Sequence, residues 1–188
     1  MLASPVWRAR PRQTWALATF TLGLLAGALT TGAALLVIAG LLSPLPVTLR
    51  LWVFLAIALF TLLHELGVAA LPLLQPRWQV PREVFEHGLV SGSLKFGFEL
   101  GLGFRTYVSA SSVYVLAGGL ALLTTAPLMT FAAAVGFGLG RATPPWMRYW
   151  HGRREAWDEA LRPTLRWFKP LSLPLVTAAL LVVSFAGS

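Results

Sequence analysis

The sequence predicts an all-α integral membrane protein with five transmembrane helices, and three observations support this fold class. Apolar residues make up 56% of the 188 residues, and charged residues only 12%, whereas soluble proteins usually carry ~25% charged residues. The mean hydropathy is +0.70. Several apolar segments reach the ~20 residues that a helix needs to cross the hydrocarbon layer. Because such a chain cannot cover itself with polar surface in water, we expect it to fold in a bilayer.

The predicted spans belong to a single membrane domain that covers residues 1–188. Charged residues are absent from Trp15 to Leu42, a run about twice the ~7–15 residues of a signal-peptide core, so this segment is expected to be a retained helix. Residues 88–123 are too many for one simple crossing. Either this third span is long and tilted, or residues 88–104 re-enter or lie in the interface and residues 106–123 cross. The expected spans are residues 14–42, 51–71, 88–123, 127–140 and 171–186.

The distribution of basic residues predicts the orientation of the chain. Twelve arginines and lysines lie in the N-terminal tail, between the second and third spans, and after residue 140. The alternate loops contain Arg50 and no other basic residue. Cytoplasmic loops are enriched in Lys and Arg. We therefore expect a multi-pass protein of the plasma membrane with a cytoplasmic N-terminus and an external C-terminus.

A tryptophan-rich basic segment, residues 145–161, follows the fourth span. Trp146, Trp150 and Trp157 recur at helical spacing between arginines. This pattern predicts an amphipathic helix in the cytoplasmic interface, bound to anionic lipid headgroups. The alternative is a cytoplasmic helix packed on the protein. Because the basic residues flank long apolar segments, the net charge of +8 favours the membrane surface, and no nucleic-acid partner is expected.

Five ionisable residues fall at membrane depth: His64 and Glu65 in the second span, and Lys95, Glu99 and Arg105 in the third. A charge in the middle of a spanning helix costs at least ~2.5–3.5 kcal/mol on insertion scales, so such residues normally face the bundle interior. They predict a substrate, ion or proton site, in which Glu65 and Glu99 share a similar depth. Two alternatives stay open: ion pairs that fix helix register, or snorkelling of the cations if residues 88–104 are interfacial.

A polar tract in the third span includes Tyr107, Ser111 and Tyr114, which share one helix face. Serine in a membrane helix more often joins helices than attacks a substrate, and no catalytic residue is predicted. GxxxG spacing occurs at three pairs of glycines and predicts close helix packing, within one chain or between copies of a homo-oligomer. The pairs are Gly23 and Gly27, Gly88 and Gly92, and Gly97 and Gly101.

Metal and thiol chemistry are not expected. The chain has no cysteine. His64 and Glu65 begin a zinc-peptidase pattern, but Val68 stands where that pattern requires its second histidine. We therefore predict neither a metal site nor a cofactor.

A weak internal repeat relates the first and third spans. Shifting the sequence by 78 residues aligns Phe20 and Gly23 with Phe98 and Gly101. A duplication would predict two parallel hairpins, an arrangement that some transporters use. Chance matching in a chain rich in Leu, Gly and Ala is the alternative.

The glycine-rich segment Gly88-Leu89-Val90-Ser91-Gly92 and the long third span resemble membrane proteins of cytochrome c biogenesis and thiol-disulfide transport, the DsbD and CcdA kind. That family resembles two inverted triplets of helices, each with a proline-cysteine pair in its first helix. This chain lacks the cysteines, so the resemblance implies a small transporter-like bundle without thiol electron transfer.

The residues at membrane depth favour a small transporter or permease component with an intramembrane acidic site. The second hypothesis is a non-catalytic membrane subunit or scaffold, which docks a protein partner through its tryptophan-rich cytoplasmic helix. An intramembrane enzyme ranks third, because no complete catalytic set is visible in the sequence.

Overall fold

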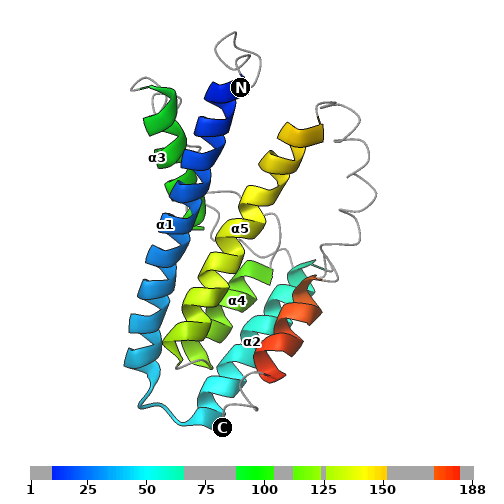
Figure 1. Ribbon diagram of the computed structural model, residues 1–188. Coiled ribbons are helices and arrows are strands. Elements are labelled where there is room, and N and C mark those ends of the chain that lie inside the picture. The colour runs from blue at the N-terminus through cyan, green and yellow to red at the C-terminus, as the bar shows by residue number, and fades with distance from the viewer. Residues whose placement is uncertain (1–9, 66–87, 104–111, 124–125, 152–171, 183–188) are drawn as a thin grey trace. The chain divides into compact units, whose positions relative to one another are not determined.

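The computed structural model describes residues 10–65, 88–103, 112–123, 126–151 and 172–182 (Figure 1). These ranges are helical apart from short turns, and they contain no strand. The all-α prediction is confirmed for this part of the chain. Its helices are α1 (Arg10–Leu42), α2 (Val47–Glu65), α3 (Leu89–Gly101), α4 (Ser112–Leu122), α5 (Pro127–His151) and the helix Ser172–Val182.

The chain divides into two compact units that alternate along the sequence. Because α1 and α5 each contribute to both units, the units are not successive domains. The single domain over residues 1–188 stays a prediction. Unit 1 comprises Met1–Thr31, Gln75–Tyr107 and Ala132–Gly152, and unit 2 comprises Gly32–Leu74, Val108–Phe131 and Arg153–Ser188.

In unit 1, α1 runs parallel to α3 and packs against it through glycines (Figure 1). A Cβ atom added to Gly23 would lie 2.8 Å from the Phe98 nitrogen and 3.1 Å from the Cα of Gly97. Gly27 meets Gly101 in the same way one helical turn later. Since no other residue allows this backbone approach, the glycines at GxxxG spacing set the distance between the helices.

In unit 1, α5 runs in the opposite direction to α1. Thr14, near the start of α1, is hydrogen-bonded to Tyr149, near the end of α5. Thr21 accepts a hydrogen bond from Trp146, and further along α1 the backbone of Leu25 lies against Gly138. Contacts that advance along α1 while they retreat along α5 show that the two helices are antiparallel.

In unit 2, α2 packs against α4 and the helix Ser172–Val182 around an apolar core. The core consists of Phe54, Ala58, Val115, Leu122, Leu173 and Leu180. Arg50, in the first turn of α2, donates a hydrogen bond of 3.4 Å to the carbonyl of Leu122 in the last turn of α4, so α2 and α4 are antiparallel.

The helix Ser172–Val182 runs parallel to α4. Its first residue, Ser172, donates to the hydroxyl of Ser112, the first residue of α4 (3.3 Å). Further along, Leu180 covers Gly119 of α4.

The third predicted span is not one continuous helix. Glycine 103 has φ +72°, a left-handed conformation that ends α3. The backbone N–H of Leu102 donates a hydrogen bond to the carbonyl of Phe98 (3.0 Å), and that of Gly103 donates one to the carbonyl of Leu100 (3.3 Å). A new helix, α4, begins at Ser112. One continuous helix over the third predicted span is therefore wrong, because α3 ends at Gly101. The sequence gives no direct signal for the positive φ of Gly103 that ends it.

The fourth predicted span ends too early. α5 passes through Pro144 and Pro145 and continues to His151, whereas the sequence predicted an end at Gly140 and a separate interfacial helix from residue 145. The last turns of α5 gain the hydrogen bonds of Trp146 and Tyr149 to α1, which offset the two backbone hydrogen bonds that the prolines remove. Residues 152–161 of the predicted interfacial helix lie outside the described residues.

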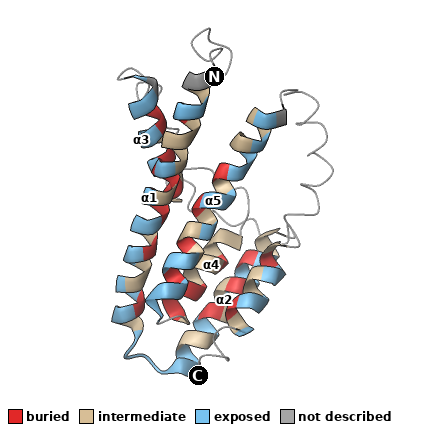
Figure 2. Ribbon diagram, viewed as in Figure 1, coloured by how far each residue is buried: buried red, intermediate tan, exposed pale blue. Residues whose placement is uncertain are grey.

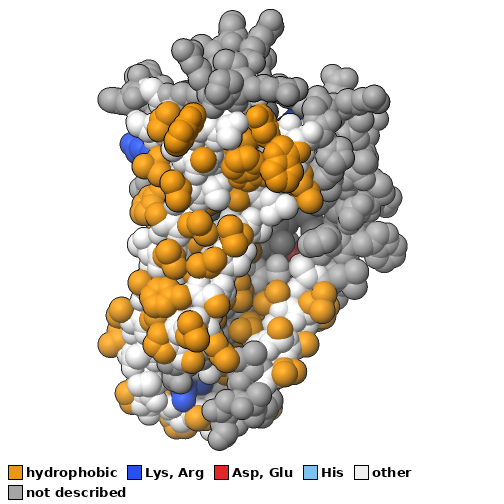
Figure 3. Space-filling view, viewed as in Figure 1, with side chains coloured by type: hydrophobic (Ala, Val, Ile, Leu, Met, Phe, Trp, Pro, Cys, Tyr) orange, Lys and Arg blue, Asp and Glu red, His pale blue; other side chains and the backbone are white. Residues whose placement is uncertain are grey.

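Two helices of the described chain are long and apolar enough to cross a membrane: Gln13–Leu42 of α1 and Val47–Glu65. Along α1 the buried residues face its neighbours, while Trp15, Leu22 and Leu29 form an exposed apolar stripe at seven-residue intervals (Figure 2). Hydrophobic side chains cover much of the described surface in the space-filling view (Figure 3). Such a surface is typical of helices that contact lipid.

Candidate functional site

Glu99 is a buried acid near the end of α3. Its side chain is only 9% exposed. It lies two residues from both Gly97 and Gly101, which places it ~160–200° around the helix from the glycines that contact α1. A buried carboxyl group at this position is costly unless its polar atoms have partners, so Glu99 is the strongest candidate for a functional residue.

Lys95 does not share the environment of Glu99. It lies one turn earlier on α3, and its side chain is exposed while that of Glu99 is buried. The predicted pairing of Lys95 with Glu99 stays a prediction.

The end of α3 is surrounded by polar and aromatic groups of α1 and α5. Thr31 of α1 donates a hydrogen bond of 3.0 Å to the carbonyl of Leu102. On the other side, a Cβ atom added to Gly103 would lie 3.9 Å from the ring of Phe137. The guanidinium carbon of Arg141 lies 5.5 Å from the centre of that same ring, a distance typical of a cation–π contact.

Arg141 is a candidate that the sequence analysis missed. It was counted as a loop residue, because the fourth span was expected to end at Gly140. In the structure it lies within α5, half-buried, with ten residues of helix after it. Its four-residue spacing from Phe137 was a signal that could have indicated a helical cation–π pair.

The helix contacts of unit 1 place Glu99 at a definite height along α1. Gly27 packs against Gly101 in the parallel pair, so Glu99 lies level with Leu25. Leu25 is ten residues from Trp15, or ~15 Å along the helix, about half of the ~30 Å hydrocarbon thickness. A span that begins near Trp15 would therefore hold Glu99 near the middle of the bilayer.

Arg141 lies at a similar height. Leu24 and Leu25 meet Gly138, and Arg141 is three residues beyond Gly138 in the antiparallel helix α5. This corresponds to ~5 Å along the axis, towards the end that carries Trp15.

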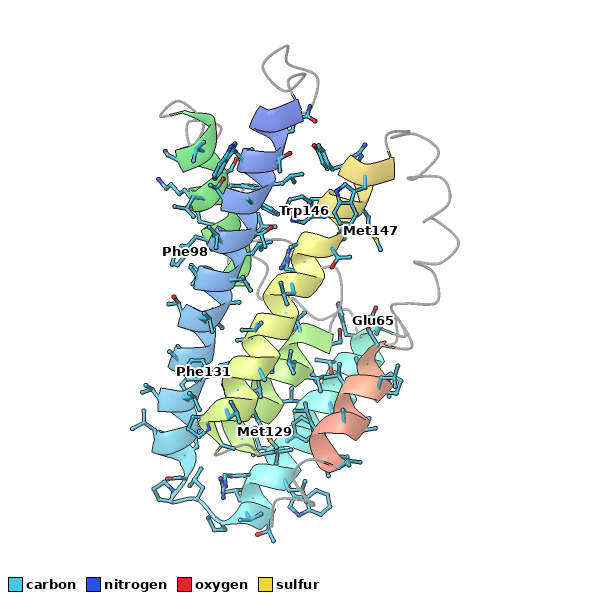
Figure 4. The ribbon with its side chains drawn as sticks, viewed as in Figure 1. Glu65, Phe98, Met129, Phe131, Trp146 and Met147 are labelled. Carbon is cyan, nitrogen blue, oxygen red and sulfur yellow. The ribbon has the colours of Figure 1, made fainter. Side chains whose placement is uncertain are left out.

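His64 and Glu65 lie in the last turn of α2, in unit 2, and both are half-buried (Figure 4). Glu99 belongs to unit 1, and each unit is described by itself. The prediction that Glu65 and Glu99 line one site therefore stays a prediction.

The polar tract is described only in part. Arg105, Tyr107 and Ser111 lie outside the described residues, and Tyr114 is half-buried in α4. Ser112, in the same tract, bonds Ser172 of the neighbouring helix. This contact fits the interpretation of the tract serines as residues that join helices. Gly88 also departs from its predicted packing role, since a Cβ atom there would meet nothing within 4 Å.

A metal centre is not evident in the described ranges, which contain no cluster of three or more His, Cys, Asp or Glu side chains.

Comparison with known proteins gives one distant relative. The chain is 32% identical over 136 residues to the methylamine utilization protein MauF of Methylophilus methylotrophus, and the match covers 69% of this chain and 47% of MauF. No family model and no solved structure matches the chain. The resemblance to thiol-disulfide membrane transporters is therefore wrong. That resemblance rested on glycine-rich segments, which occur in many membrane helices. The chain spans about half the length of the curated relative that it does match.

Proposed function

We propose that this chain is a multi-pass membrane protein of amine utilization, a permease component in which Glu99 binds a small ammonium cation near the middle of the bilayer. The observation that supports this most is the burial of Glu99 beside the interrupted end of α3. Ionisable groups at membrane depth are rare, and they often mark substrate and ion pathways.

The helix directions support a multi-pass topology. In unit 1, α3 is parallel and α5 antiparallel to α1. In unit 2, α2 is antiparallel to α4 and to the helix Ser172–Val182. A chain that crosses alternately from a cytoplasmic N-terminus requires these directions for each pair. The observed directions are thus compatible with alternate crossings, and the positive-inside rule supplies the orientation.

The chemistry of the site suits a cation. The carboxylate of Glu99 supplies negative charge, and the carbonyl end of α3 adds the negative end of a helix dipole. Interrupted helices in transporters use such carbonyl ends to bind cations. Arg141 lies ~5 Å along the helix axis from Glu99, with its guanidinium over the ring of Phe137.

The relative suggests which cation to test. Its name associates it with methylamine utilization. An alkylamine resembles the side chain of lysine, whose pKa is ~10.4, so methylamine is a cation at neutral pH. Methylammonium has three N–H donors, which match carboxylate and carbonyl acceptors.

The test is uptake of radiolabelled methylamine into vesicles that contain the purified full chain. The wild type should accumulate methylamine above empty vesicles, and Glu99→Gln should abolish this uptake while the protein still inserts. Thr143→Ala, at an exposed position of α5, is the control and should leave the uptake unchanged. Uptake by Glu99→Gln equal to the wild type would refute a role of Glu99, and no uptake by the wild type would refute the permease.

A second function is favoured by a different observation. Met147 (Figure 4) and Trp150 lie in the last turns of α5 and are both exposed. A subunit or scaffold could dock a protein partner there. Such a scaffold predicts that Trp150→Ala, and not Glu99→Gln, abolishes growth of the host cell on methylamine. The permease predicts the reverse.

A further inference from the structure

An aromatic cluster holds α1 and α5 together at one end of unit 1. Trp146 donates from its indole nitrogen to the hydroxyl of Thr21 (2.9 Å), and Tyr149 shares a hydrogen bond of 2.9 Å with Thr14. The ring of Trp146 contacts Tyr149 and Trp150, with centroids 6.2 and 6.1 Å apart. These contacts fix the height of α5 against α1.

Trp15 and Trp150 point outward at the same height as this cluster. Trp15 is 68% exposed and Trp150 is 76% exposed. Each is the chain neighbour of a residue in the Thr14–Tyr149 hydrogen bond, so both side chains leave the protein at one level. Exposed tryptophan at a common height is typical of a membrane–water interface, where the ring lies in the acyl region and the N–H meets the headgroups.

Among the described residues at this end, basic ones lie in the first turn of α1 and in the last turn of α5. The first turn of α1 contains Arg10 and Arg12 and no acidic residue. Acidic side chains are the ones that the positive end of a helix dipole favours at this position. Arg148 lies in the last turn of α5, between the tryptophans of the cluster. Positive groups on a positive helix end create a local potential that a phosphate group can neutralise.

We propose that this end of unit 1 binds the headgroups of anionic lipids. We name it the tryptophan collar and define it by Trp15, Trp146, Tyr149, Trp150 and Arg148. The indole rings of Trp15 and Trp150 lie in the acyl region with their N–H groups at the headgroups, and Arg148 contacts a lipid phosphate. This inference does not depend on Glu99 or on transport.

The absence of cysteine from the chain allows a direct measurement of depth. Single cysteines at Trp15, Trp150, Leu22 and Leu29 can be spin-labelled in the full-length protein in bilayers, and their collisions with oxygen and with a water-soluble nickel complex compared. Labels at Trp15 and Trp150 should report the same depth, near the phosphates. Labels at Leu22 and Leu29 should lie ~10 and ~20 Å deeper, because each step is seven residues of helix. A label at Trp150 in bulk water, or at a different depth from Trp15, would overturn the proposal.

Lipid selectivity tests the charge part of the proposal. Spin-labelled phosphatidylglycerol should be immobilised by the protein more than phosphatidylcholine, and salt should reduce the difference. Arg148→Gln should lower the preference by up to about fivefold, as expected for one arginine at a charged surface. Thr143→Ala, at an exposed position of the same helix, is the control and should leave it unchanged. Equal immobilisation of both lipids by the wild type would instead identify the collar as a surface for a protein partner and refute the proposal.

Discussion

The hydroxyl of Thr31 on α1 donates a hydrogen bond to the backbone carbonyl of Leu102, 3.0 Å away, at the point where α3 ends. A helix that ends inside the bilayer leaves carbonyl groups that water cannot reach, so the protein itself must supply donors. In the proposed topology, Thr31 is one such donor. This contact ties the interruption of the third span to the first helix, and it keeps the region beside Glu99 in a defined conformation.

Removal of the Thr31 hydroxyl should therefore loosen the end of α3. We expect Thr31→Val to lower the free energy of unfolding by ~0.6 kcal/mol, the average for interhelical hydrogen bonds in a membrane protein, and by no more than ~1.7 kcal/mol. Thr30→Val is the control, since Thr30 is exposed and bonds only within α1, to Ala26. Equal stability of the two variants in a detergent unfolding titration would contradict this role of Thr31.

The glycines at the α1–α3 contact should not tolerate a methyl group. A Cβ atom on Gly27 would lie 2.9 Å from the Leu102 nitrogen, so Gly27→Ala must separate the helices, at a cost of ~1–3 kcal/mol. Gly140→Ala in α5 meets nothing within 4 Å and should stabilise the helix slightly, because alanine is the better helix former. Unfolding titrations that rank the two variants in the opposite order would disprove the close contact.

The bond between Trp146 and Thr21 can be measured by a double-mutant cycle. Trp146→Phe removes the indole donor, and Thr21→Val removes its acceptor. We expect a coupling energy of ~0.6 kcal/mol between the two positions. The control is a second cycle that combines Trp146→Phe with Thr19→Val. The hydroxyl of Thr19 donates to carbonyls of its own helix, those of Trp15 and Ala16. A coupling indistinguishable from that of Thr19 would show that the two helices are not joined here.

Single cysteines can also test the proposed topology. Pro46→Cys should react with an impermeant thiol reagent added outside intact cells, and Gly152→Cys should react only after the cells are opened. The asymmetric distribution of basic residues along the sequence leads to this expectation. External labelling of Gly152→Cys would reverse the whole orientation.

The sequence predicted the features that depend on composition and local pattern. Apolar content and charge distribution gave the helical class and the expected orientation. The GxxxG spacing of Gly23, Gly27, Gly97 and Gly101 indicated a close helix contact, which the structure locates between α1 and α3. The repeat also suggested parallel first and third spans, although the observed contact pairs Gly23 with Gly97 and not with Gly101.

Features that depend on tertiary contacts could not be predicted. Gly103 takes a positive φ only where α3 ends beside Thr31 and Phe137. Pro144 and Pro145 normally indicate the end of a helix, but contacts of Trp146 and Tyr149 with α1 favour its continuation. Arg141 consequently moved from an expected loop into a helix, which is why the sequence analysis passed over it.

The central proposal is that Glu99 binds a small ammonium cation, and ligand-induced stabilisation tests it most directly. The melting temperature of the purified full chain should rise with methylammonium chloride and not with equal sodium chloride. At a ligand concentration 100 times the Kd, the expected stabilisation is ~2.7 kcal/mol. Glu99→Gln should fold and lose this increase, whereas Thr143→Ala, at an exposed position of α5, should keep it. An increase of the same size in Glu99→Gln, or none in the wild type, would contradict the proposed site.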